Sequence, residues 1–315
     1  MRTLHPRAFT VSVIWTLGLL YLGSVVHATE SSLACPDWPT CFGSWMPEMT
    51  GGVFWEHLHR LVAGGLLLLW GLAIWLVRKE VARGSWVAKA GWSGMGLLLI
   101  QSVFGGLTVI FLLPDLLSTT HLTLALVFLA LATVLASATG WTRGMEPLEP
   151  GDGHWLRRWA VASASLIFFQ SVLGGLVRHQ DAGLACPDIP LCLGQVIPPL
   201  GNHLIAIHFV HRWLGVVAGV VVVALAVGLA RRSVPASLRS WANGAAALVV
   251  LQVALGFISV YTRLEVVPVS LHSLLAAGLI VTLIHLAVAG TRIGTPAASR
   301  PPEVPGSTLG APLAS

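Results

Sequence analysis

Charged side chains are scarce in this sequence. Asp, Glu, Lys and Arg make up 10% of the 315 residues and hydrophobic residues make up 55%, whereas about 25% of an ordinary soluble domain is charged. So few charges cannot cover the surface of a soluble fold of this size, and that class is excluded. The composition predicts an integral membrane protein whose chain crosses the bilayer several times.

A basic patch and a removable leader are also lacking. The formal net charge is +5, but the Lys and Arg residues are dispersed at the edges of apolar segments, which argues against a nucleic-acid partner. Residues 1–6 are followed by an apolar run of full spanning length without a small-residue cleavage pattern. We therefore expect no cleaved signal peptide and a first helix that stays in the membrane.

Eight stretches of the sequence are apolar and long enough to cross a bilayer, which takes about 20 residues. Short polar connections separate them, and the residues after 291 are rich in Pro, Ala, Ser and Gly. We predict an all-α integral membrane protein with eight transmembrane helices and a disordered cytoplasmic tail at 291–315. The predicted helices cover residues 8–26, 55–77, 90–113, 116–141, 159–177, 204–230, 241–262 and 266–289.

The basic residues predict the orientation of these helices. All but four of the 18 Lys and Arg residues fall on one side, which is the cytoplasm by the positive-inside rule. Both termini are then cytoplasmic, the protein lies in the cell (plasma) membrane, and the connections 29–54 and 179–203 face outward. The four exceptions are Arg60, Arg178, Arg212 and Arg263.

The two halves of the sequence repeat one another. Residues 33–41 match residues 184–192 at an offset of 151, and residues 101–106 match 251–256 and resemble 170–175. Because the repeated unit has four helices, both copies insert in the same orientation, so we expect two four-helix bundles related by a pseudo-two-fold axis along the membrane normal. The expected division is 1–150, 151–290 and the tail 291–315.

Four histidines are matched by the repeat and lie at one depth. His59 corresponds to His211 and His121 to His272, and each is followed after 19 to 22 residues by a basic residue of the cytoplasmic side. At about 1.5 Å per residue, all four lie roughly 30 Å from that side, near the outer surface. Facing pairs of histidines in a helix bundle can hold a haem. These four residues are therefore the predicted iron ligands, two in each half.

Other interpretations of these histidines stay open. A lone intramembrane His is often a hydrogen-bonded structural residue or a proton relay. Zinc fits less well, because it would need three or four converging ligands, usually with a carboxylate or thiolate, and the sequence offers two pairs.

The residues beside the histidines differ between the halves at one position. Arg60 and Arg212 each follow a predicted ligand and suit haem propionates, or else extend to the membrane surface as interfacial arginines. Glu56 in the first half corresponds to His208 in the second. A carboxylate in a haem pocket can move protons or stabilise positive charge, which makes Glu56 the candidate catalytic residue. The alternative is a helix-terminal carboxylate favoured by the helix dipole.

All four cysteines lie in the two outward connections, as Cys35 and Cys41 and as Cys186 and Cys192, each pair six residues apart. In an oxidising compartment we expect a disulfide within each pair. The alternative is that either pair exchanges as a redox-active bridge. We expect both connections to cover the haem sites from outside.

Taken together, these features resemble the haem A synthase family of cytochrome oxidase assembly proteins, in its bacterial type with two cysteine pairs. The resemblance runs from about residue 10 to 290 and rests on Glu56-x-x-His59-Arg60, His121, His208-x-x-His211-Arg212, His272, the two Cys-Pro-Asp loops and the Gln-Ser-Val-x-Gly-Gly segments.

The resemblance implies a haem-dependent oxidoreductase. It would oxidise the C8 methyl of haem O to a formyl group, through successive hydroxylations and loss of water, to give haem A for cytochrome oxidase. The first half would hold haem O or haem A as substrate or product, with Glu56 acting on it. The second half would hold a permanent haem b that passes electrons. Arg178, which the repeat places opposite His27, would contact a propionate.

The resemblance also implies partners, and the residues leave other functions open. Haem O synthase and the cytochrome oxidase assembly machinery are the implied partners, with an unidentified electron donor, and a homo-oligomer stays open. One alternative is a bis-haem b electron-transfer protein, which explains the histidines but not Glu56. Another is a quinone-coupled thiol oxidase, which explains the cysteines but not the histidines. A transporter would suit the duplication, but no broken helix or charged midplane residue is visible.

Overall fold

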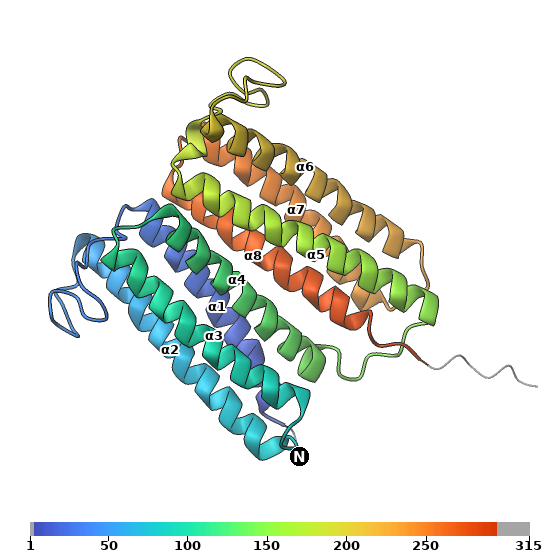
Figure 1. The fold of residues 1–315 in the computed structure, drawn as a ribbon. Coiled ribbons are helices and arrows are strands. Elements are labelled where there is room, and N and C mark those ends of the chain that lie inside the picture. Colours follow the sequence, from blue (N-terminus) through green and yellow to red (C-terminus); the bar gives the residue numbers. More distant parts are fainter. Residues whose placement is uncertain (1–2, 295–315) are drawn as a thin grey trace, which may run out of the picture.

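The computed structural model describes residues 3–294, which form eight long helices. All eight predicted spans are confirmed, since each helix is long and apolar enough to cross a membrane. The tail beyond residue 294 lies outside the described residues. The helices are α1 (His5–Ala28), α2 (Gly51–Glu80), α3 (Trp86–Ile110), α4 (Asp115–Ala136), α5 (Pro150–His179), α6 (His203–Ala230), α7 (Ala236–Tyr261) and α8 (Val266–Ala289) (Figure 1).

Local sequence signals explain several helix ends. Ser85 caps α3 by accepting a hydrogen bond from the Ala88 amide, and Asn202 caps α6 by accepting one from the Leu204 amide. A π-helical turn (η1, Ser137–Trp141) extends α4, and a short 3-10 helix (η2, Ala182–Leu184) follows α5. The long connections 29–50 and 180–202 both lie at one end of the helices, which we name the loop end (Figure 1).

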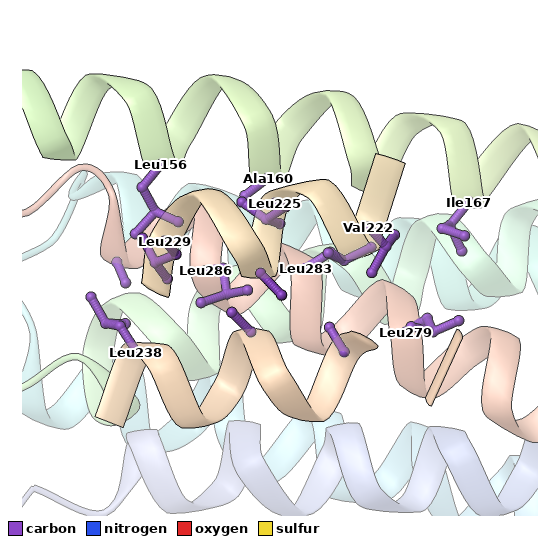
Figure 2. Close-up of a cluster of buried hydrophobic side chains, with 14 of the residues drawn as sticks. Leu156, Ala160, Ile167, Val222, Leu225, Leu229, Leu238, Leu279, Leu283 and Leu286 are labelled. Carbon is purple, nitrogen blue, oxygen red and sulfur yellow. The ribbon is translucent and has the colours of Figure 1, made fainter. Parts of the chain in front are cut away.

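Helices α1–α4 pack as one group and α5–α8 as another (Figure 1). In the first group, the fully buried Trp70 lies between Phe9 and Phe128, with ring centres 5.3 and 4.8 Å away. The core of the second group consists of aliphatic side chains from all four of its helices (Figure 2). Labelled members are Leu156, Ala160, Ile167, Val222, Leu225, Leu229, Leu238, Leu279, Leu283 and Leu286.

The two groups meet through α1, α4, α5 and α8. Near the loop end, the hydroxyls of Ser24 and Ser273 lie 3.3 Å apart, and near the other end Trp141 stacks on Trp241. Large apolar side chains such as Leu68 (77% exposed) and Val220 (65% exposed) point away from the protein. An apolar exterior on so many helices fits a lipid surrounding.

Candidate functional site

The four predicted ligands lie within the first three turns of the four helices that start at the loop end. His59 and His211 come eight residues after the first residue of α2 and α6, and His121 and His272 come six residues after the first residue of α4 and α8. At about 1.5 Å per residue, all four rings lie roughly 9–12 Å into the helices from that end. The common depth expected from the sequence therefore agrees with the helix boundaries.

Each histidine ring packs against a glycine of the preceding helix. A Cβ added to that glycine would lie 2.8–3.1 Å from the Cε1 atom of the ring, which is too close for an unrelaxed contact. The absence of a side chain at these positions makes room for the imidazoles. The pairs are Gly23 with His59, Gly105 with His121, Gly174 with His211, and Gly256 with His272.

The pair in the second group has a spacing that suits a shared iron. The ring centres of His211 and His272 lie 6.5 Å apart, with their planes at 72°. Two imidazoles that bind one metal through facing nitrogens have ring centres roughly 6 Å apart, because each metal–nitrogen bond is about 2.0–2.1 Å long and the nitrogen lies about 1 Å from the ring centre. Within residues 3–294 there is no group of three or more His, Cys, Asp or Glu side chains arranged for a metal. The donor set fits a haem held by two histidines.

Hydrogen bonds fix the rings of three histidines. The Nδ1 atom of His121 lies 3.2 Å from the carbonyl oxygen of Gln101, and that of His272 lies 3.0 Å from the carbonyl oxygen of Gln252. A carbonyl accepts, so in both rings Nδ1 carries the proton and Nε2 keeps the lone pair that a metal needs. In His211, Nδ1 lies 2.9 Å from the side-chain amide of Gln170.

Glu56 is buried and binds the first loop of the loop end (residues 29–50) as well as its own helix. One carboxylate oxygen accepts a hydrogen bond of 2.8 Å from the Cys35 amide, and the other forms an ion pair of 2.5 Å with Arg60. Arg60 in turn donates to the carbonyl oxygens of Asp37 and Thr40. The carboxylate, the guanidinium and the loop therefore form one network above His59.

The second half contains the same network with an imidazole in place of the carboxylate. The amide nitrogen of Cys186 lies 3.3 Å from Nδ1 of His208, and Nε of Arg212 lies 3.1 Å from its Nε2; the neutral imidazole accepts a hydrogen bond from one of these two donors at a time. Arg212 also donates to loop carbonyls, including that of Asp188. His208 and Glu56 thus have the same loop-holding role, but only Glu56 can carry a negative charge there.

Both loops are closed by disulfides, Cys35–Cys41 and Cys186–Cys192, with sulfur–sulfur distances of 2.03 and 1.94 Å. In the first loop, the carboxylate of Asp37 accepts hydrogen bonds from the Thr40 hydroxyl and from two backbone amides. These bonds, the Thr40 hydroxyl first, hold the pKa of Asp37 below its ordinary value. Trp38 lies against Gly106 of α3, so this loop covers α3 next to the glycine that receives His121.

Arg178 lies where the two helix groups meet. Its guanidinium donates to the hydroxyl and carbonyl oxygens of Ser24 in α1, at 3.3 and 3.1 Å. The rings of His27 and His179 lie edge to face 5.4 Å apart, and Nδ1 of His179 lies 2.9 Å from the Thr119 hydroxyl. Ser24 directly follows Gly23, the glycine against which the ring of His59 packs. Arg178 therefore contacts the residue next to that glycine.

Two features of this site were not predicted from the sequence. The first is the set of glycines under the histidines, for which the repeated Gln-x-x-x-Gly segments are a signal. The second is that Arg60 and Arg212 donate hydrogen bonds to loop carbonyls. The spacings Glu56-x-x-x-Arg60 and His208-x-x-x-Arg212 place each arginine one helical turn from its partner, which is the sequence signal for this network. His285, near the opposite end, contacts Trp241 and Trp141 and lies apart from the four matched histidines.

Fold and site together define a polytopic helical membrane protein with two pairs of histidines at one end of its helices. The profile of the cytochrome oxidase assembly protein family matches residues 50–284. The chain belongs to this family. A haem A synthase of Caulobacter vibrioides is 34% identical over 314 residues, covering 84% of this chain and 89% of the relative.

Other relatives agree over most of their length. A haem A synthase of Rhodospirillum centenum is 29% identical over 354 residues, covering 95% of this chain and 90% of the relative. One of Symbiobacterium thermophilum is 28% identical over 291 residues, covering 88% of this chain and 92% of the relative. The similarity therefore includes both helix groups and both loops.

Proposed function

We propose that this protein is a haem A synthase, a membrane oxidoreductase that converts haem O to haem A. Family membership supports the class of reaction. The observation that carries the proposal is the asymmetry between two otherwise matched sites, because the buried carboxylate of Glu56 is replaced by the imidazole of His208 in the second site. A carrier of electrons alone has no use for a charged group in only one of its sites.

The two halves have different tasks in this proposal. Residues 1–150 hold haem O, the substrate, between His59 and His121, and residues 151–290 hold a haem b between His211 and His272. A pseudo-two-fold axis along the membrane normal relates the halves. Haem supplies an iron that accepts and donates single electrons. The ring spacing of 6.5 Å in the second half supports the haem b site.

The protein's own groups orient the reactants and control protons. A glycine beneath each imidazole makes room for the ring, and in His121 and His272 the hydrogen bond from Nδ1 to a backbone carbonyl leaves Nε2 with the lone pair that iron needs. The first loop, tied down through Cys35, Asp37 and Thr40, limits the access of water to the first site. Glu56 accepts a proton, or balances positive charge, as the C8 methyl is oxidised.

Three arginines are the proposed partners of haem propionates. Loop carbonyls hold Arg60 and Arg212 next to His59 and His211, so each positive charge is fixed beside one proposed haem. Arg178 binds Ser24 through neutral oxygens only, which leaves its charge available to a propionate.

We also propose the orientation and partners that follow from this function. Both termini face the cytoplasm of the cell membrane, and the disulfide-closed loops face outward, where disulfides persist. Haem O synthase delivers the substrate, and the cytochrome oxidase assembly machinery receives the product. Self-association is a further proposal, to be tested by the mass of the purified protein in detergent.

The direct test is expression in a bacterial strain that makes haem O but lacks its own haem A synthase. Extracted pigments are separated by reversed-phase chromatography and identified by mass. The proposal expects haem A to appear together with haem b in the purified protein. Haem b alone, with haem O unchanged in the membranes, would instead support the bis-haem b electron-transfer alternative.

A further inference from the structure

The two loops at the loop end each expose three apolar side chains at matched positions. All six side chains are between 45% and 74% exposed, and residues 38–47 and 189–200 contain no Asp, Glu, Lys or Arg. The offset of 151 pairs the first tip with the second, where the first tip is Phe42, Trp45 and Met46 and the second tip is Leu193, Val196 and Ile197. An exposed apolar patch that occurs twice indicates a surface that contacts something other than water.

Both tips include a tight turn that bulky residues rarely adopt. Cys41 and Ser44 exchange two backbone hydrogen bonds of 3.0 Å, and Phe42 and Gly43 between them have φ angles of 52° and 70°. A two-residue turn with positive φ at both positions favours Asn and Gly, and a bulky residue with positive φ is an outlier. Leu193 occupies the same position in the second loop, with φ 53°. Strain that is kept in both copies points to a use for the apolar side chain.

The backbone amides of these turns have partners inside the protein. Those of Phe42 and Gly43 donate to the carboxylate of Asp37, at 2.6 and 3.0 Å. In the second loop the Gly194 amide donates to the carboxylate of Asp188 at 2.7 Å. Unpaired backbone groups are what makes an irregular loop costly against lipid. Because these amides are paired, the turns can approach an apolar surrounding at a lower cost.

The first tip lies beside α2 and not beyond its end. The carbonyl oxygen of Trp45 lies 3.1 Å from Nε2 of His57, whose side chain is buried. His57 comes six residues after the first residue of α2, so the backbone at Trp45 lies roughly 9 Å along the helix from the loop end. Trp55 and Leu61 of the same helix are exposed. The tip therefore lies at the level where the apolar exterior of α2 begins.

The two loops lie on opposite flanks of the molecule. Figure 1 shows the first connection turned outward beside the start of α2, and the second turned outward beside the start of α6. Helix α2 packs on α1 and α3 of the first group, and α6 packs on α5 and α7 of the second. One partner protein would meet one flank, whereas a lipid leaflet surrounds the helices and meets both.

From these observations we infer that the two tips are anchors that insert into the boundary between headgroups and acyl chains, in the lipid leaflet at the loop end. Amphipathic aromatic side chains such as Trp45 are enriched at this level of a membrane. The base of the first loop binds Glu56 through the Cys35 amide, and it binds Arg60 through loop carbonyls. Lipid that holds the first tip therefore also steadies the loop over the first site, whichever reaction takes place there.

The test uses the full-length protein, labelled with 5-fluorotryptophan, in phosphatidylcholine nanodiscs. Fluorine resonances are assigned by single Trp→Phe substitutions. They are measured with a lipid that carries a nitroxide at the top of its acyl chain and, separately, with a water-soluble gadolinium chelate. The Trp45 signal should lose most of its intensity with the nitroxide lipid and much less with the chelate. A reporter introduced by Val196→Trp should behave in the same way at the second tip.

Two tryptophans of α2 are the matched controls. Trp75 is exposed on the helix exterior and should respond to the nitroxide lipid, whereas the fully buried Trp70 should respond to neither agent. A Trp45 signal that the chelate removes and the nitroxide lipid leaves would place the first tip in water and overturn the inference.

The remaining outcomes also decide. A Trp45 signal that responds to neither agent, as Trp70 does, would mean that a second copy of the chain covers the tip, and lipid insertion would be wrong. The inference concerns both tips, so a response at only one of them overturns it. Should the Val196→Trp protein not fold, Ile197→Trp places the reporter on the neighbouring residue of the second tip and decides in its place.

Discussion

Glu56 and Arg60 form an ion pair of 2.5 Å one turn apart on α2, and each also binds the first loop. In the second half His208 and Arg212 make the equivalent contact at 3.1 Å. The same architecture is therefore stable with a carboxylate or with an imidazole. This equivalence makes it possible to separate the loop-holding role of Glu56 from a chemical one.

Glu56→His should keep the fold and the bound haem but abolish haem A production. The imidazole can lie between the Cys35 amide and Arg60 as His208 lies between Cys186 and Arg212, accepting from one of the two donors, but it supplies no negative charge. Acid–base groups are typically worth about 10²–10⁴ in rate, whereas a helix-terminal charge is worth only about 0.3–1 kcal/mol. Haem O and haem A in cells are measured by chromatography.

Glu56→Gln is the companion variant, and it should also lose haem A, because the amide neither takes a proton nor balances positive charge. If its amide nitrogen faces Arg60, two donors meet and the ion pair with Arg60 is lost, so some loosening of the first loop is expected as well. His208→Glu is the control for charge placement and should leave haem A production largely intact. Near-normal haem A from well-expressed Glu56→His protein would leave Glu56 as a loop anchor only.

His211→Ala and His272→Ala should each abolish the stably bound haem b. The two rings lie 6.5 Å apart, and removing either leaves one axial ligand. The measurement is the reduced-minus-oxidised absorbance spectrum of the purified variants, with His285→Ala as a control histidine far from the site. Retention of the full low-spin haem b spectrum by either ligand variant would remove these residues from the proposed site.

Gly174→Ala should lower haem b content without a change in chemistry. The added methyl would lie 2.8 Å from Cε1 of His211, so the ring or helix α5 must shift, and overpacking of this kind typically costs about 1–3 kcal/mol. Gly244→Ala is the matched control, because a Cβ at that position meets no atom within 4 Å. Equal haem content in the two variants would show that the glycine is not needed to seat the ring.

The cysteine pairs should be found as Cys35–Cys41 and Cys186–Cys192 in isolated protein. Non-reducing peptide mapping after rapid alkylation identifies the bonds, which close the loops that Arg60 and Arg212 hold. The double variant Cys35→Ser with Cys41→Ser should loosen the first loop and reduce haem A, while haem b in the second half stays. Alkylated free thiols at these positions in fresh protein would contradict the structural role.

Hydropathy, charge and repetition in the sequence determined the eight helices, the pairing of the halves and the common depth of the four histidines. These are properties of chain segments, because spanning length and helix rise depend only on local composition and spacing. The exchange of Glu56 for His208 was also readable from the repeat.

Only the tertiary structure decided what each of these residues contacts. Gly23 and His59 are 36 residues apart, and the packing of the ring on this glycine appears only when α1 packs on α2. Arg60 was expected to face a propionate, but its proximity to the Asp37 and Thr40 carbonyls depends on how the first loop folds back over α2. Contacts between helices follow from packing across the bundle, which segment-by-segment patterns do not encode.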